Sequence, residues 1–456
     1  MRITFINPKP AIWIKSATIP LGIAYISSYL RAKGFDEIDA VDLNFDPAAQ
    51  IPISDIYGIT ATTPLINPAF ETAARIKAAA PDAKIILGGA HPTNEPEEAL
   101  NNRNIDFVIR GEGEKVFYEL ISALAQKKDF SGISGLSYMR DNMPVHNPSE
   151  FIEDLDALPF PDIEIFGDLS KYTHPQPLIG WRKPVVNMIT SRGCPFDCYF
   201  CYKGTFGRKW RARSPENVIR EWEKLIRVNR VKEIGIQDDI FNTDLNRAKD
   251  IMKGITADKL KIPFTFPNGI RADILDEELV SMMKDAGLYR TAIGVESGVQ
   301  EVVDKIGKNE KLADVEKAMK LFKKYKIQVI TFYVMGHPDD TEETMEETIK
   351  YSIKLDPHFS QYAMATPFPG TRLYDKLKKT GGLKIKKWDD YSQFDQKGYF
   401  DYPHLSGDTI MKYVKRAYKK FYFRAGFIVK MLTLKDFYIK IPQFLQGLVH
   451  FVIKGK

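Results

Sequence analysis

The three cysteines of this 456-residue chain lie within eight residues of one another. They are Cys194, Cys198 and Cys201, in the segment Cys194-Pro-Phe-Asp-Cys198-Tyr-Phe-Cys201. Thiols clustered at such short spacings indicate metal ligation or redox chemistry rather than packing. Iron–sulfur clusters and structural zinc sites ordinarily take four ligands, so three thiolates predict a cubane cluster with one iron open to a substrate or co-substrate. A zinc site completed by a histidine is the alternative, but the spacing is unlike that of zinc knuckles.

The cysteine loop follows the first strand of a series in which strands and helices alternate. We expect helices between the strands, one of them opened by Ser214-Pro215 and another following Asp339-Asp340-Thr341. Six units of this size predict most of a TIM-type barrel, a partial (β/α)6 barrel whose active site lies at the carboxyl ends of the strands. The expected strands cover residues 185–190, 233–237, 264–266, 290–295, 328–335 and 362–365.

A second alternating series comes first in the chain and predicts a doubly wound, Rossmann-like parallel sheet. Expected strands cover residues 2–7, 37–43, 56–60, 84–87 and 107–110, and expected helices cover residues 20–33, 67–80 and 114–126. Ligands of such sheets bind at the carboxyl ends of the strands. The predicted domains are an α/β domain at 1–146, a proline-containing linker at 147–183, the barrel at 184–403 and a helical tail at 404–456.

Composition and charge restrict the class of protein. Apolar residues make up 44% and charged residues 27% of the chain, as in soluble globular proteins. No apolar run is long enough to span a membrane, and the N-terminus does not resemble a secretory signal, so we expect a cytoplasmic protein. Residues 409–456 hold eleven Lys or Arg and one acid, whereas the rest of the chain is mildly acidic. Nucleic acid is therefore not an expected partner.

The tail allows two interpretations. Its basic residues alternate with ten aromatic residues, a combination suited to peripheral contact with an anionic membrane, such as the inner face of the cell membrane. A lipid-like substrate would then be favoured over another small molecule. The alternative is a helical cap whose aromatic side chains pack on the barrel while its lysines face water. The aromatic residues are Tyr413, Tyr418, Phe421, Tyr422, Phe423, Phe427, Phe437, Tyr438, Phe444 and Phe451.

The cysteine loop and the strand ends together resemble the radical S-adenosylmethionine superfamily. The matching segments are Gln237–Phe241, Asn268–Asp273, Gly294–Gly298, Met335–Pro338 and Pro367–Thr371, in the order in which the family carries its strand motifs. The resemblance implies a 4Fe-4S cluster that chelates S-adenosylmethionine at its open iron. Reduction of the cluster, by a donor such as flavodoxin or ferredoxin, would release a 5′-deoxyadenosyl radical that abstracts hydrogen from an unactivated carbon.

The same resemblance implies roles for single residues. Phe200 would present its backbone to the adenine, and Glu296 and Ser297 would contact the ribose or the methionine amine. Gly336 would let the backbone approach the ligand closely. Asp238, with its neighbour Asp239, would contact the methionine amine or the substrate, or would only cap a helix. Ordinary strand-end and turn roles are the alternatives for Glu296, Ser297 and Gly336.

The N-terminal domain resembles the cobalamin-binding domain that precedes the barrel in one branch of the superfamily. The resemblance implies that Thr60 and Thr62 bond the nucleotide tail of cobalamin and that Gly88 and Gly89 let the backbone pass close to it. Glu112, in another matching segment, would also contribute to cofactor binding. The motif Asp-x-His-x-x-Gly is missing, so we expect that no histidine binds cobalt from below. A degenerate domain without ligand is the alternative. The matching segments are Pro20–Tyr25, Gly58–Thr60, Gly88–Thr93, Ile109–Glu114 and Leu155–Asp162.

The resemblance implies a cobalamin-dependent C-methyltransferase as the leading function. One S-adenosylmethionine would make the radical, and a second would supply the methyl group through cobalamin. A non-methylating oxidative cyclase or rearrangement enzyme on the same scaffold is the first alternative. A non-enzymatic cobalamin or redox sensor is the second, although a structural cluster would gain from a fourth ligand.

Overall fold

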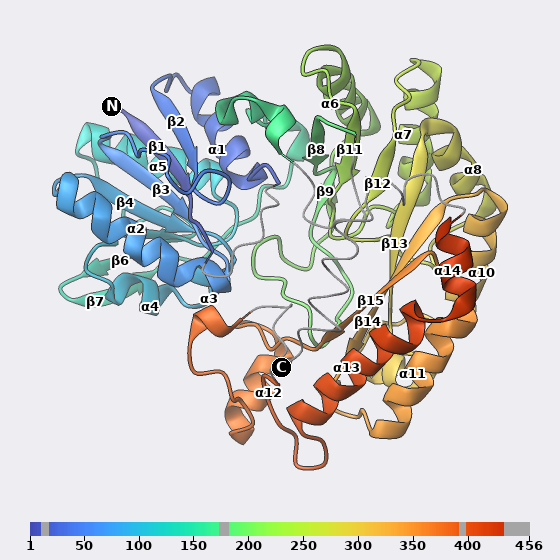
Figure 1. Cartoon of the computed structure of the whole chain (residues 1–456). Helices are drawn as coiled ribbons and strands as arrows, with labels where there is room; N and C mark the ends of the chain where they lie inside the picture. The colour runs from blue at the N-terminus through green and yellow to red at the C-terminus, as the bar shows by residue number, and fades with distance from the viewer. Residues whose placement is uncertain (11–17, 173–181, 392–397, 433–456) are drawn as a thin grey trace.

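The computed structural model describes residues 1–10, 18–172, 182–391 and 398–432, and its N-terminal domain is built on one seven-stranded sheet (Figure 1). The strand order is β2-β1-β3-β4-β5-β6-β7, and the first five are parallel. The last two form an antiparallel hairpin that the sequence interpretation did not include. The strands are β1 (Ile3–Asn7), β2 (Ile38–Asp42), β3 (Ile56–Thr60), β4 (Lys84–Gly88), β5 (Phe107–Ile109), β6 (Leu136–Arg140) and β7 (Met143–His146).

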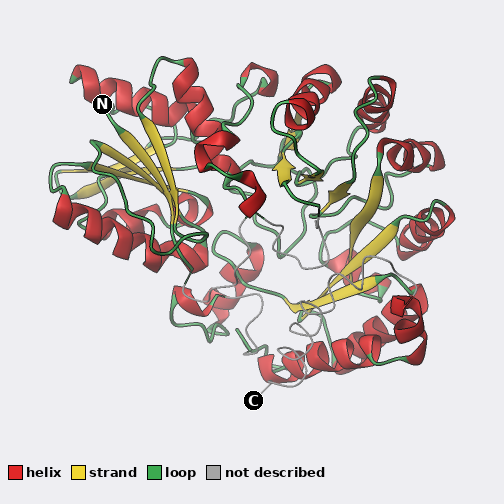
Figure 2. Ribbon diagram, turned by 45° about the horizontal axis from the view of Figure 1, so that its top comes forward, coloured by secondary structure: helices red, strands yellow, loops and turns green. Residues whose placement is uncertain are grey.

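Helices cover both faces of this sheet, as Figure 2 shows. Helices α1 (Leu21–Ala32) and α5 (Glu114–Gln126) pack apolar side chains such as Ile23 and Phe117 on one face. Helices α2 (Ile66–Ala79) and α4 (Pro96–Asn101) pack on the other face, and α3 (Ala90–Asn94) follows β4. The domain is therefore doubly wound, as predicted, with an antiparallel edge.

The second domain is an open barrel of six parallel strands in chain order. Within the described residues its edge strands β8 and β15 do not bond to each other. The strands are β8 (Val185–Met188), β11 (Glu233–Ile236), β12 (Phe264–Phe266), β13 (Leu288–Glu296), β14 (Gln328–Met335) and β15 (Phe359–Met364). The helices are α6 (Pro215–Arg227), α7 (Leu245–Ala257), α8 (Glu277–Ala286), α9 (Gln300–Lys305), α10 (Leu312–Lys324), α11 (Glu342–Leu355) and α12 (Arg372–Thr380).

Side-chain caps start the barrel helices where the sequence predicts them. Ser214 accepts a hydrogen bond from Asn217 N, with Pro215 at the first helical position. Thr341 opens α11 through a capping box with Thr344. The described part of the linker between the domains, up to residue 172, holds three short 3₁₀ helices, Leu155–Ala157, Ile163–Phe166 and Leu169–Lys171.

The described part of the tail is a packed cap on the barrel. Helix α13 (Gly407–Tyr422) lies along β15 and α11, and α14 (Ala425–Leu432) follows it. The Tyr422 hydroxyl donates to Ser360 O at 2.7 Å, and Phe421 and Phe427 are buried. Residues 433–456, with the predicted aromatics Phe437, Tyr438, Phe444 and Phe451, lie outside the described residues. The cap interpretation therefore holds for α13 and the start of α14.

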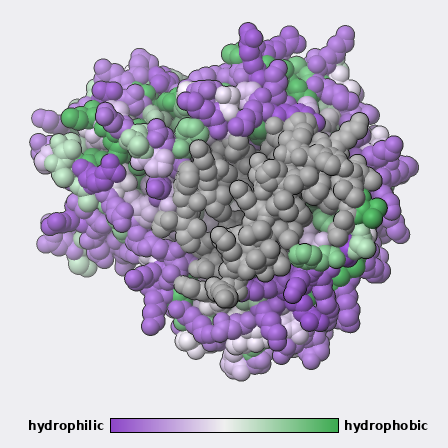
Figure 3. Space-filling model, in the orientation of Figure 1, coloured by the Kyte–Doolittle hydropathy of each residue, from purple (hydrophilic) through white to green (hydrophobic). Residues whose placement is uncertain are grey.

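The surface offers no described element for crossing a membrane. No described helix is both long and apolar enough to do so. The face in Figure 3 is mainly hydrophilic where it is coloured, with apolar side chains scattered among charged ones. Such scattered apolar residues are ordinary on a protein surface.

Candidate functional site

The cysteines lie on a loop whose base is closed by a short antiparallel ribbon. Strands β9 (Ser191–Arg192) and β10 (Arg211–Ala212) pair with Arg192 opposite Arg211. Gly193 has φ +84°, and a Cβ there would lie 2.3 Å from Lys209 O. Only glycine suits this position, because the backbone is left-handed and the facing strand is in contact. The loop of residues 193–210 is thus held at its base while its tip extends over the barrel.

The three thiols line one cavity with the carboxyl ends of the barrel strands. The cavity has a volume of ≈ 530 Å³ and includes Cys194, Cys198 and Cys201. Strand-end residues on its wall come from five successive strands or the loops after them. They include Asp239, Asn268, Arg271, Glu296, Tyr333, Met364 and Thr366. The predicted meeting of the cysteine loop and the strand ends is therefore present in the fold.

The protein environment raises the pKa of two of the three thiols. Burial raises the pKa of Cys198, although the nearby Lys308 ammonium opposes this shift. Cys201 is open to the cavity, yet the surrounding protein atoms raise the pKa of its thiol to about 12. Metal binding to such thiols releases their protons.

Three thiols on one wall fit a cluster better than a single ion. No group of three Cys, His, Asp or Glu side chains in the described part of the chain is arranged to hold one metal ion. An iron–sulfur cluster spreads its thiolate ligands around a body larger than one ion, and cysteine is its usual ligand. The donor set at this wall is therefore that of a cluster.

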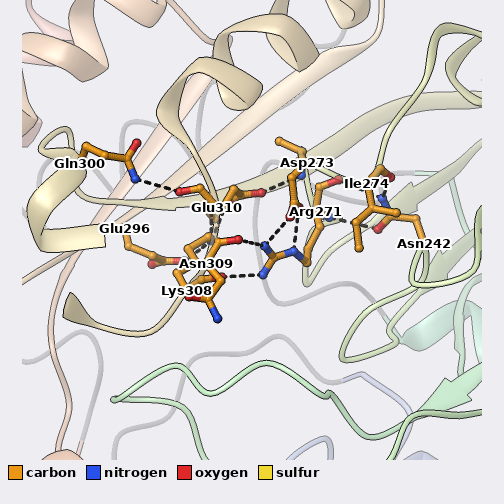
Figure 4. Close-up of polar contacts among 11 residues, drawn as sticks. Asn242, Arg271, Asp273, Ile274, Glu296, Gln300, Lys308, Asn309 and Glu310 are labelled. Atoms are coloured by element: carbon orange, nitrogen blue, oxygen red, sulfur yellow. Dashed lines mark hydrogen bonds and ion pairs between the residues drawn. The ribbon is translucent and has the colours of Figure 1, made fainter. Parts of the chain in front are cut away.

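A buried charge network contributes to the electrostatic environment of Cys198, and Figure 4 shows its members Lys308, Glu296 and Glu310. The Lys308 ammonium lies 3.0 Å from Glu296 Oε1 and 3.3 Å from Glu310 Oε2. Burial alone would lower the pKa of Lys308, but the two carboxylates raise it above the ordinary lysine value. Glu296 has φ +67° at an irregularity in the pairing of β13 with β14. Strained backbone of this kind often marks functional sites, and here it aims a carboxylate at the cavity.

Arg271 extends this network and was not predicted. Its guanidinium lies 3.6 Å from the ring centre of Phe196, on the cysteine loop. It also donates to Asp273 and to the carbonyls of Lys308 and Asn309. The arginine therefore connects the cysteine loop to the segment after α9. Arg271 lies within the matching segment Asn268–Asp273, and this was the one sequence feature that could have indicated a role at the site.

The other predicted contacts of S-adenosylmethionine divide into two groups. Phe200 and Glu296 line the cavity, and the ring of Phe200 lies 5.4 Å from that of His337. Asp238 does not line it, because its buried carboxylate accepts hydrogen bonds from Thr190 N at 2.6 Å and Ser191 Oγ at 2.6 Å. The neighbouring Asp239 faces the cavity instead.

Ser297 and Gly336 also lie outside the cavity wall. The Ser297 hydroxyl bonds Thr348 Oγ1 at 3.1 Å. Gly336 has φ +88°, its N–H donates to Asp340 at 2.9 Å, and a Cβ there would meet Ile410 at 2.9 Å. These residues shape the strand ends, and packing against α13 rather than ligand approach explains the glycine.

A second pocket lies between the N-terminal sheet, α1, α5 and the cysteine loop. It has a volume of ≈ 230 Å³, and Thr60, Gly88, Gly89 and Glu112 line it. Thr62 does not line it and is exposed to solvent. The pocket also includes Thr205 and Phe206 of the cysteine loop.

The glycines of this pocket serve different purposes. A Cβ on Gly58 would lie 2.6 Å from the Phe5 ring, and one on Gly89 would lie 2.5 Å from Ala61 O. Protein packing thus accounts for both. A Cβ on Gly88 would meet only Ile109 O, at 3.9 Å, and one on Gly22 would meet nothing within 4 Å. Gly88 and Gly22 are therefore two positions that leave room for a ligand.

His91 is turned away from this pocket. Its ring bonds Thr63 Oγ1 at 3.3 Å and Glu98 Oε2 at 3.2 Å, and it packs on Trp388. No histidine is among the described residues that line the pocket. That no histidine binds cobalt stays a prediction. His91, however, is held by Thr63 and Glu98 outside this pocket.

Comparisons with known proteins agree with both domains. Residues 188–352 match the family described as Radical SAM superfamily, and residues 11–121 match the B12 binding domain. An uncharacterized methyltransferase of Pyrococcus horikoshii is 34% identical over 90% of this chain and 89% of its own length. The anaerobic magnesium-protoporphyrin IX monomethyl ester cyclase of Rubrivivax gelatinosus is 28% identical over 94% of this chain and 78% of its own length.

A solved structure shares the fold. The radical S-adenosylmethionine methyltransferase TsrM from Kitasatospora setae, with cobalamin and a 4Fe-4S cluster bound, matches with a TM-score of 0.70. The match covers 85% of this chain and 80% of that chain at 19% identity. At this identity the likeness supports the arrangement of domains.

Proposed function

The chain belongs to the radical S-adenosylmethionine superfamily, in the branch with a B12 binding domain before the barrel, and from this premise we propose that it is a cobalamin-dependent C-methyltransferase. The observation that carries the proposal is that one loop borders two cavities. Its cysteines line the barrel cavity, and its residues Thr205 and Phe206 close the pocket of the N-terminal domain. A cluster and a cobalamin held there would lie on opposite sides of the same loop.

Bound together, the cluster and S-adenosylmethionine supply a carbon-centred radical, and cobalamin supplies a transferable methyl group. In the proposal, Cys194, Cys198 and Cys201 hold the cluster. The carboxylate of Glu296, fixed by the ammonium of Lys308, binds the amine or ribose of S-adenosylmethionine. The apolar wall of the cavity, which includes Phe332 and Met364, excludes water from the reacting carbon.

The N-terminal pocket suits the tail of cobalamin. Gly88 leaves open space at the end of β4, and Thr60 offers a hydroxyl on the same rim. Apolar side chains from α1 and α5, such as Ile23 and Phe117, contribute to the wall. A planar aromatic tail fits such a wall better than a charged one.

The partners follow from the proposed chemistry. The enzyme needs a small-molecule or lipid-like substrate and a one-electron donor such as flavodoxin or ferredoxin, and it works in the cytoplasm. Peripheral membrane contact through the C-terminal tail, residues 404–456, would support a lipid-like substrate. The packed aromatics of α13 favour the cap interpretation for the described part of the tail. Sedimentation with anionic and neutral vesicles distinguishes these cases, because only membrane contact gives binding that depends on lipid charge and salt.

An oxidative cyclase is the second candidate. The Rubrivivax relative named as a cyclase is 28% identical and covers 94% of this chain, so the scaffold alone does not separate the two outcomes. A cyclase would produce 5′-deoxyadenosine without transfer of the methyl group. The balance of products therefore decides between the candidates.

The test is to incubate anaerobically reconstituted protein with methyl-labelled S-adenosylmethionine and a cell extract. The methyltransferase proposal expects label in a new product, together with both 5′-deoxyadenosine and S-adenosylhomocysteine. Cys198→Ala is the matched control and should give none of these. Formation of 5′-deoxyadenosine that depends on an extract compound, without labelled product, would favour the cyclase.

A further inference from the structure

Four charged side chains are buried together where the N-terminal domain meets the base of the cysteine loop. Arg192 and Arg211 each place an Nη1 atom 2.9 Å from the carboxylate of Glu112. Arg192 also places Nη2 2.5 Å from Glu114. Glu112, Glu114 and Arg211 are each 4% exposed, and Arg192 is 3% exposed. The two arginines and two glutamates thus form a quartet of balanced charge that is almost wholly buried.

Aromatic rings from three segments enclose the quartet. The Arg192 guanidinium lies 5.1 Å from the ring centre of Tyr25 on α1 and 5.2 Å from that of Phe206 on the cysteine loop. Arg211 lies 5.0 Å from the ring of Phe151 in the linker. Burying such charges adds little stability compared with apolar packing, but it penalises every arrangement that leaves one of them unpaired. The quartet therefore specifies one position of the loop base on the N-terminal domain.

The position of the loop base affects the walls of both cavities. Arg192 and Arg211 face each other in the ribbon that closes the loop of residues 193–210. Residues Cys194 to Lys203 of this loop supply a wall of the barrel cavity, whereas Thr205 and Phe206 supply a wall of the N-terminal pocket. Displacement of the loop base would alter both walls at once.

Resting on the proposed function, we propose that Glu112 is a positioning residue that couples the two cofactor sites. Through Arg192 and Arg211 it holds the loop base in the one position that both sites require. The first cofactor to bind orders the part of the loop beyond this fixed base, so the second binds to a loop that is already ordered and binds more tightly. The coupling is reciprocal, because it is a difference in binding free energy. Glu112 also lines the N-terminal pocket, but the coupling that we propose acts through the loop base.

The test measures the dissociation constant of hydroxocobalamin by equilibrium dialysis, before and after reconstitution of the cluster. For the wild type, reconstitution should tighten binding by about fivefold or more, the lower range of measured couplings. Glu112→Gln removes the charge that both arginines share. In this variant the ratio of the dissociation constant before reconstitution to that after reconstitution should fall to about one. The matched control is Glu221→Gln, on α6 in a buried ion pair with Arg213, and it should keep the wild-type ratio of dissociation constants.

A reciprocal measurement separates positioning from simple destabilisation. Hydroxocobalamin should slow the loss of cluster iron to a chelator in the wild type and in Glu221→Gln, but not in Glu112→Gln. If Glu112→Gln does not fold, Arg211→Lys replaces it. Lysine keeps the charge but cannot bond Glu112, Ile152 O and Phe206 O together, so the ratio should again be lost.

The possible results test the coupling, the positioning role of Glu112 and the proposed cofactor separately. Equal affinity of the wild type for hydroxocobalamin before and after reconstitution would refute the coupling and leave the proposed function intact. A wild-type ratio in Glu112→Gln, or in Arg211→Lys where that variant replaces it, would refute the positioning role. Failure of the wild type to bind hydroxocobalamin would overturn the proposed cofactor and the coupling with it.

Discussion

Replacing Lys308 by methionine removes a buried ammonium that lies between two carboxylates beside the cysteine cavity. Its Nζ atom is 3.0 Å from Glu296 and 3.3 Å from Glu310. With an effective dielectric constant of about 20, each attraction amounts to about 5 kcal/mol, and the loss of hydration opposes it by several kcal/mol. Methionine preserves most of the side-chain volume but removes the ammonium between the two buried carboxylates. The expected loss of unfolding free energy is about 3–5 kcal/mol.

The loss has a definite pH dependence. Burial lowers the pKa of Lys308 in the wild type, but the two glutamates outweigh this effect and raise it above the usual value. The stabilisation by the ammonium is therefore complete below the unfolded lysine pKa and is lost only as the pH rises through the folded one. In Lys308→Met, protonating either carboxyl relieves their repulsion. The destabilisation should then shrink as the pH is lowered from about 8 toward about 5.

The assay is anaerobic thermal unfolding at both pH values. A domain of this size loses about 2–4 °C per kcal/mol, so the apparent melting temperature should fall by about 10 °C at the higher pH. The matched control is Lys311→Met, because Lys311 is 63% exposed and pairs with Asp304 on the surface. Its melting temperature should change by less than about 2 °C. A shift for Lys308→Met no larger than the control, or equal at both pH values, would refute the reasoning.

Three further predictions concern the N-terminal pocket and the tail. Gly88→Val should weaken hydroxocobalamin binding by about tenfold or more, because the added methyl groups enter the open space of the pocket. The control Gly132→Val, in an open loop, should bind hydroxocobalamin normally. Equal binding by both variants would contradict this prediction. Electron paramagnetic resonance of the cob(II)alamin form should lack splitting from a protein nitrogen, because His91 is engaged away from the pocket; nitrogen splitting would disprove it. Tyr422→Phe should lower the free energy of unfolding by about 1–3 kcal/mol, because the N–H and carbonyl of Ser360 lose the Tyr422 hydroxyl as their partner. An unchanged free energy of unfolding, measured with denaturant, would contradict the packing of the cap on the barrel.

Periodicity predicted most of the fold because most elements bury one regular face. The helix expected at residues 114–126 is observed as Glu114–Gln126, with Val116, Phe117 and Leu120 on its buried side. The hairpin β6–β7 escaped prediction because its second strand, Met143–His146, has no buried residue to set an alternating pattern. Partly exposed edge strands carry little hydrophobic signal.

The site was predicted in its chemistry but not in all its geometry. The chain has three cysteines and they lie close together, so the sequence alone predicted metal ligation or redox chemistry. Asp238 and Asp239 are equivalent in sequence, yet neighbouring residues at a strand end point to opposite sides, and only Asp239 reaches the cavity. Lys308 and Arg271 were missed because their contacts join segments 12 and 37 residues apart through irregular loops. No local pattern encodes such contacts.

The most direct test of the central claim is the metal content and spectrum of protein purified and reconstituted without oxygen. The account predicts about four irons and four sulfides per chain, and a reduced cluster whose electron paramagnetic resonance signal changes when S-adenosylmethionine is added. Alanine at Cys194, Cys198 or Cys201 should abolish the reductive cleavage of S-adenosylmethionine. Stoichiometric zinc without iron in the anaerobically purified protein would contradict the account.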